Sequence, residues 1–178
     1  WCATLGLNGL ISAGVPQDWA THMIGHELTA LKGLDHGKTL AVVLPAMLKI
    51  RAGEKKEKLL QYAQRVWGIQ SGDDEARIEM AIEKTRDFFE RMGVSTRLCH
   101  YGIDKGIIPE VVGQLKAHGM VRLGEKRDVT PELVAALLQD CFCLLYTSDA
   151  ADDLLCVDLG GSRIIKKKNA KVTPMSIK

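Results

Sequence analysis

Apolar residues recur every three or four positions through most of the first 142 residues, and this spacing constrains the fold more than any other feature. Such a period places apolar side chains on one face of an α-helix, where other helices can bury them. Glycine and proline turns such as Gly14-Val15-Pro16 separate the periodic stretches. The pattern predicts an all-α helical bundle. Its expected helices span residues 2–13, 18–31, 36–50, 55–67, 74–92, 108–118 and 130–141.

The composition suits a single soluble domain. Of 178 residues, 46% are hydrophobic and 26% are charged, and the net charge of +2 favours no particular partner. The longest apolar run, residues 39–48, is too short to span a bilayer and contains Pro45, so we expect no membrane partner. No secretory segment is visible and the five cysteines form no CxxC pair, so we expect a cytoplasmic location.

A basic cluster at Lys55, Lys56 and Lys58 is the strongest sign of a nucleic-acid partner. Glu54 and Glu57 lie among these lysines at helical spacing. Such alternation is typical of a solvated helix face with its own ion pairs. We therefore expect no nucleic-acid partner.

Three of the five histidines, His22, His26 and His36, lie within one short stretch. His22 and His26 are four residues apart, so on a helix they share one face. His36 follows His22 by fourteen residues, which on an unbroken helix is roughly 21 Å along the axis. Each imidazole nitrogen of a metal site lies about 2.0 to 2.1 Å from the ion, so His22 and His36 can share one only if the helix ends between them.

Residues 32–35 supply that break. Gly33 can adopt the left-handed conformation that ends a helix, and Asp35 can cap the next one. The chain would then fold back and bring His36 over the face that carries His22. The residues alone leave two hypotheses open, a metal site and a stripe of histidines that binds nothing.

The run GVPQDWATHMIGHELTALKGLDHGKTLAVVLPAML resembles the iron-containing alcohol dehydrogenases, in particular their NADPH-dependent butanol dehydrogenase and aldehyde reductase branch. The blocks DWATH, GHEL and DHG match in order and spacing, and flanking segments such as HGMVRLGEKRDVTPEL match as well. The resemblance covers about residues 1–142. It implies the C-terminal helical, metal-binding domain of such an enzyme, truncated at its N-terminus, with the α/β nucleotide-binding domain absent.

The resemblance also assigns roles to the histidines. It implies that His22 and His36 bind a divalent metal, Fe²⁺ or Zn²⁺, since neutral imidazole suits both ions. It places His26 beside the nicotinamide of NADP(H), as a catalytic residue for positioning or proton transfer. The counterpart of Asp18 is not a ligand in the family, so we expect Asp18 to support the site or to interact with the helix dipole.

For the complete enzyme, the resemblance implies the reduction of small aldehydes to primary alcohols, with a homodimer as the expected assembly. The family's two other metal ligands, an aspartate and a histidine, and its NADP(H)-binding domain would lie upstream of this chain. We therefore expect the chain to be a fragment that binds metal weakly and is itself inactive.

The sequence changes character from about Cys143. The segment CLLYTSDAADDLLCVDLGGSRIIKKK has no counterpart in the dehydrogenase family and resembles a translated sequencing-library adapter. We expect residues 143–178 to be a non-native, poorly packed tail.

Two alternative functions stay open beside the dehydrogenase. One is a self-sufficient helical metalloprotein, such as a hydrolase, in which Asp18, His22, His26 and His36 close around one ion. The other is a helical interaction module without metal. A His26 ring turned away from His22 and His36 would favour the dehydrogenase.

Overall fold

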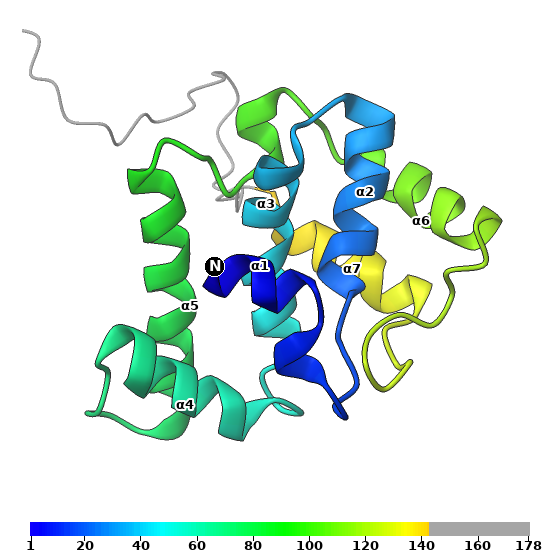
Figure 1. Ribbon diagram of the computed structural model, residues 1–178. Helices are drawn as coiled ribbons and strands as arrows, with labels where there is room; N and C mark the ends of the chain where they lie inside the picture. The colour runs from blue at the N-terminus through cyan, green and yellow to red at the C-terminus, as the bar shows by residue number, and fades with distance from the viewer. Residues whose placement is uncertain (143–178) are drawn as a thin grey trace, which may run out of the picture. The chain divides into compact units, whose positions relative to one another are not determined.

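The computed structural model describes residues 1–142, so the tail predicted at 143–178 lies outside the described residues. Helices dominate the described part, and its single β-type pairing is the isolated bridge between Leu123 and Val129. The predicted all-α class is confirmed (Figure 1). The elements are α1 (Cys2–Leu7), η1 (Leu10–Ser12), α2 (Ala20–Lys32), α3 (His36–Ile50), α4 (Lys56–Trp67), α5 (Asp74–Arg91), η2 (Leu98–Tyr101), α6 (Ile107–Ala117) and α7 (Pro131–Asp140).

Six of the seven expected helices occur within two residues of their predicted ends, and the first does not. The stretch predicted as one helix over 2–13 ends at Leu7 and resumes as the 3₁₀ turn η1. Gly9 separates the two with φ of +77°, a left-handed conformation that stops an α-helix. The 3₁₀ turn η2 was not predicted, because four residues are too few to show a period.

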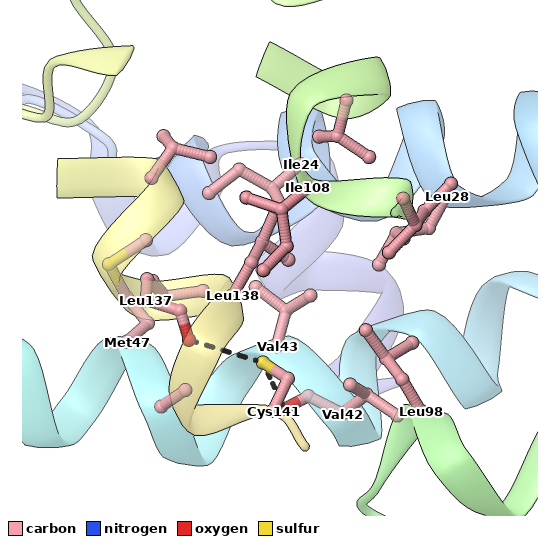
Figure 2. Close-up of a cluster of buried hydrophobic side chains, with 14 of the residues drawn as sticks. Ile24, Leu28, Val42, Val43, Met47, Leu98, Ile108, Leu137, Leu138 and Cys141 are labelled. Carbon is pink, nitrogen blue, oxygen red and sulfur yellow. Dashed lines mark hydrogen bonds between the residues drawn. The ribbon is translucent and has the colours of Figure 1, made fainter. Parts of the chain in front are cut away.

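Helix α3 is central to the main core. It packs against α2, α5 and α7, while α6 packs against both α2 and α7 (Figure 1). Figure 2 shows Val42, Val43 and Met47 of α3 among side chains from α2, α6 and α7. The thiol of Cys141 lies in the same cluster, 3.5 Å from the carbonyl oxygen of Leu137. Burial in this single core fixes α2 and α3 relative to each other.

Helices α4 and α5 pair with each other around two smaller apolar clusters. One contains Leu59, Ile78 and Ile82, and the other contains Ala63, Ile69 and Ala81. The N-terminus of α5 is capped by Asp73, whose carboxylate accepts a hydrogen bond of 2.8 Å from the backbone N–H of Ala76. Within residues 1–142, no helix is both long and apolar enough to cross a membrane.

Candidate metal centre

The turn between α2 and α3 forms as the sequence predicts. Gly33 adopts φ of +67° at the C-terminus of α2, and its N–H donates to the carbonyl of Thr29 at 2.8 Å. Asp35 occupies the N-cap position of α3, but its side chain makes no capping hydrogen bond. Its carboxylate instead pairs with Lys38 at 2.6 Å. The predicted N-cap position of Asp35 is therefore confirmed, whereas the expected capping hydrogen bond does not form.

This turn brings the three histidine rings together. The ring centroids are 5.2 Å apart for His22 and His36, 5.1 Å for His26 and His36, and 6.2 Å for His22 and His26. No hydrogen bond or ion pair holds any of these rings within residues 1–142. His26 is therefore not turned away from the other two, contrary to the orientation that we expected to favour the dehydrogenase.

The ring spacing is compatible with shared metal binding. A tetrahedral ion with metal–nitrogen distances of about 2.0 to 2.1 Å separates the centroids of two ligating imidazoles by about 5 Å. His22 with His36 matches this spacing, and so does His26 with His36. His36 is common to both pairs. Distance alone therefore does not choose between His22 and His26 as its partner.

His22 is the half-buried member of the three, while His26 and His36 are exposed. Burial lowers the pKa of His22, and the nearby rings of His36 and His26 lower it further. The edge of Trp19 also meets the ring of His22, with centroids 5.1 Å apart. A lowered pKa favours the neutral imidazole, which is the form that binds a metal ion.

Asp18 lies two residues before α2 and uses both carboxylate oxygens within the protein. Oδ1 accepts a hydrogen bond of 3.0 Å from the N–H of Ala20, and Oδ2 lies 2.5 Å from Nζ of Lys55. Asp18 thus meets the first turn of α2 through a backbone hydrogen bond. Its carboxylate is not directed at the histidines.

The arrangement does not favour a self-sufficient metalloprotein. Within the described part of the chain, no group of three or more His, Cys, Asp or Glu side chains is placed to hold an ion. Asp18, the fourth ligand of that alternative, is instead paired with Lys55. Residues 1–142 therefore provide no more than a pair of imidazoles as metal ligands.

Lys55 corrects the expectation of a fully solvated basic face. Its side chain is only 24% exposed and lies between the carboxylates of Asp18 and Glu125. Lys56, by contrast, is half exposed and pairs with Asp74 at 2.8 Å. The local sequence gives no sign of this difference, because the partners of Lys55 are distant in the chain.

The other two histidines contact polar side chains. Nδ1 of His118 lies 2.8 Å from the carboxylate of Glu27, which is buried in α2. Nδ1 of His100 lies 2.5 Å from Oγ of Ser95. These contacts distinguish them from the three rings at the α2–α3 turn.

A hollow of about 440 Å³ adjoins the centre. His22 and Trp19 form part of its wall, with Leu7 and Gln17 among the other lining residues. Its volume is in the range of small-molecule sites. A small substrate could therefore approach His22 from this side.

Comparison with known proteins identifies relatives of most of the described region. Residues 5–142 match the sequence model of the Fe-containing alcohol dehydrogenase family, C-terminal. The chain is 58% identical over 130 residues to the NADPH-dependent aldehyde reductase YqhD of Escherichia coli (strain K12), covering 73% of this chain and 34% of that protein. It is 29% identical over 144 residues to NADH-dependent butanol dehydrogenase A of Clostridium acetobutylicum, covering 80% and 37%.

Solved structures agree with these matches. A crystal structure of E. coli YqhD aligns with a TM-score of 0.77 and 54% identity, covering 79% of this chain and 36% of that one. NADH-dependent butanol dehydrogenase A of Thermotoga maritima aligns with a TM-score of 0.70 and 26% identity, covering 80% and 38%. The chain spans about a third of the length of these relatives.

Proposed function

Because the chain belongs to the Fe-containing alcohol dehydrogenase family, we propose that it forms the metal-binding part of an enzyme that reduces aldehydes to primary alcohols with NADP(H). The observation that carries this proposal is the convergence of the three histidine rings at the α2–α3 turn. The names of its relatives support both the reaction and the nicotinamide cofactor, since they include an NADPH-dependent aldehyde reductase and NADH-dependent butanol dehydrogenases.

In this proposal His22 and His36 hold the divalent metal, Fe²⁺ or Zn²⁺. When bound, such an ion acts as a Lewis acid on the aldehyde oxygen and makes the carbonyl carbon a better hydride acceptor. Two imidazoles with centroids 5.2 Å apart and without hydrogen-bond partners in residues 1–142 suit this task. The lowered pKa of His22 favours the neutral form that binding needs.

His26 is proposed as the catalytic histidine, beside the nicotinamide. The alcohol oxygen needs a proton once hydride has reached the carbon, and an imidazole can supply or relay it near neutral pH. His26 is exposed and lies against His36, so it can reach an oxygen bound close to the metal ligands. Its contact with His36 also makes His26 an alternative to His22 as the second metal ligand. An experiment must therefore distinguish the catalytic role of His26 from a role in metal binding.

Two imidazoles complete only half of a typical four-ligand shell. We therefore propose that this chain alone binds metal weakly and does not reduce aldehydes. The nucleotide-binding domain and two further ligands, an aspartate and a histidine, would come from the part of the relatives that this chain does not match. A homodimer of the complete enzyme and a cytoplasmic location stay predictions of the sequence.

A chimera tests the proposal directly. Residues 1–142 would replace the corresponding segment of the E. coli relative, with which the chain shares 58% identity over 130 residues. We expect the chimera to oxidise NADPH with butanal, to lose activity on chelation, and to regain it with Fe²⁺ or Zn²⁺. The better restoring ion identifies the metal. Activity that persists after complete metal removal would contradict the proposal.

Two substitutions in the chimera separate the proposed roles. His22→Ala should remove bound metal together with activity. His26→Ala should keep the metal and lower kcat by about 10²- to 10⁴-fold, the usual contribution of general acid catalysis. If His26→Ala loses the metal and His22→Ala retains it, the two assignments must be exchanged.

A further inference from the structure

The position of His22 depends on how the first turn of α2 is held. His22 is the third residue of this helix, within the turn whose backbone N–H groups lack helical partners. The N-cap residue Trp19 provides no side-chain cap. The carboxylate of Asp18 accepts a hydrogen bond from Ala20 in its place. The start of α2 is thus tied to Asp18.

Asp18 is itself held by a residue from another helix. Its second oxygen lies 2.5 Å from Nζ of Lys55, the N-cap residue of α4. The backbone of Lys55 is anchored at both ends, since its N–H donates to Arg51 and its carbonyl accepts from Leu59. Lys55 therefore offers Asp18 a partner attached to a fixed backbone.

Neighbouring ion pairs help to fix the position of the Lys55 side chain. Arg51, one turn earlier, is buried and binds Asp128 at 2.7 Å, which fixes the α3–α4 junction. Glu125 also pairs with Lys55, at 3.4 Å. Burial alone would lower the pKa of Lys55, but Asp18 and Glu125 outweigh it and hold this pKa above its usual value. The ammonium group thus lies charged between two carboxylates.

We infer that Lys55 is a positioning residue of the metal centre, which acts through Asp18 to fix the first turn of α2 and the ring of His22. This role rests on the proposed function, because it is directed at the proposed metal ligands. Without Lys55, the carboxylates of Asp18 and Glu125 would lose their shared cation and repel each other. The first turn of α2 would then lose its external anchor.

The chain provides a matched control for a merely stabilising ion pair. Lys56 is the next residue and pairs with Asp74, joining the start of α4 to the start of α5. This pair does not involve α2. Lys55→Met and Lys56→Met each remove one ammonium group from adjacent positions, so they differ mainly in their connection to His22.

The test uses the full 178-residue chain and Zn²⁺ as the probe. We expect Lys55→Met and Asp18→Asn to raise the Kd for Zn²⁺ by about tenfold, the lower end of effects seen when support for metal ligands is removed. Lys56→Met should leave the Kd unchanged, and Lys55→Arg, which keeps the charge, should restore most of the affinity. Titration of His22→Ala identifies any Zn²⁺ bound elsewhere.

A second measurement does not depend on metal. In the metal-free chain, Lys55→Met should weaken the nuclear Overhauser contact between Trp19 and His22 and speed amide exchange at the start of α2. The inference is overturned if Lys55→Met matches Lys56→Met in both Zn²⁺ affinity and these spectra. If the unmodified chain binds no Zn²⁺ at His22, the weak metal binding proposed for this chain fails, while the chimera still tests the proposed function and the metal-free spectra still decide whether Lys55 fixes His22.

Discussion

Two groups of ionisable side chains within residues 1–142 have opposite consequences. At the histidine cluster (His22, His26 and His36), the rings lie 5.1 to 6.2 Å apart with no hydrogen bond or ion pair in residues 1–142. At what we call the Asp140 hub, the carboxylate of Asp140 binds Lys49 at 2.7 Å and Arg86 at 2.9 Å.

The two sites also differ in what they can bind. Lys49, Arg86 and Arg97 tie α3, α5 and the following loop to the end of α7, since Arg97 donates to the carbonyl of Asp140. The charges of these side chains are therefore neutralised by partners within the protein. The histidine cluster has no such partners, so its nitrogens stay available to an ion. A dense group of ionisable residues therefore suggests a ligand site only when the fold leaves it unpaired.

The largest expected effect follows the removal of His36, the histidine common to both metal-compatible pairs. His36→Ala should weaken Zn²⁺ binding on the order of 100-fold, since no pair of rings about 5 Å apart would remain. The unfolding free energy should change by less than about 0.5 kcal/mol, because the side chain is exposed and makes no hydrogen bond. Zn²⁺ titration and urea unfolding check both values, and unchanged Zn²⁺ affinity would contradict the cluster's role.

The opposite result is expected at the Asp140 hub. Asp140→Ala should lower the unfolding free energy by about 2 to 3 kcal/mol, because the nearly buried Arg86 would lose its closer carboxylate and keep only the exposed Glu83. Zn²⁺ affinity should stay the same under native conditions. The matched control Asp74→Ala breaks the exposed pair with Lys56 and a longer contact of 3.6 Å with Arg77, and it should cost about 0 to 1 kcal/mol. Equal losses for both variants would show that the hub is no stronger than a surface pair.

A smaller effect is expected for Trp19, whose ring edge meets His22. Trp19→Ala should weaken Zn²⁺ binding about threefold to tenfold, an aromatic contact being worth about 0.5 to 1.5 kcal/mol. Trp19→Phe keeps an aromatic edge and should recover most of the affinity. Zn²⁺ titration of the two variants tests this, and similar losses in both would contradict a role for the aromatic edge, because phenylalanine keeps one.

The smallest effect concerns pH. The pKa of His22 is lowered in the folded chain, so the unfolded state binds a proton first as pH falls. The unfolding free energy should therefore decrease as pH falls below about 6.5, the unperturbed pKa of histidine, and level off below the folded pKa. Urea unfolding of the metal-free chain from about pH 7.5 to 5.5 measures this. His22→Gln should flatten the curve, and an identical curve for this variant would refute the assignment.

Much of the site could be predicted from local sequence. The spacing of His22 and His26, the left-handed turn at Gly33 and the start of α3 at His36 depend on contacts within a few residues. Periodicity predicted α2, α3 and α5 nearly to their ends for the same reason. The split of the first predicted helix at Gly9 was missed, because apolar spacing continues across it while the backbone does not.

The sequence by itself determined six of the seven predicted helices and the turn that returns the chain to His22. It also carried the family resemblance that assigns metal binding to His22 and His36. Only the tertiary structure placed His26 against His36, paired Asp18 with Lys55 and neutralised Asp140 with cations from other elements. The physical reason is distance along the chain. Helix periods and turns depend on neighbouring residues, whereas an ion pair between residues 37 positions apart depends on how the core packs the helices together.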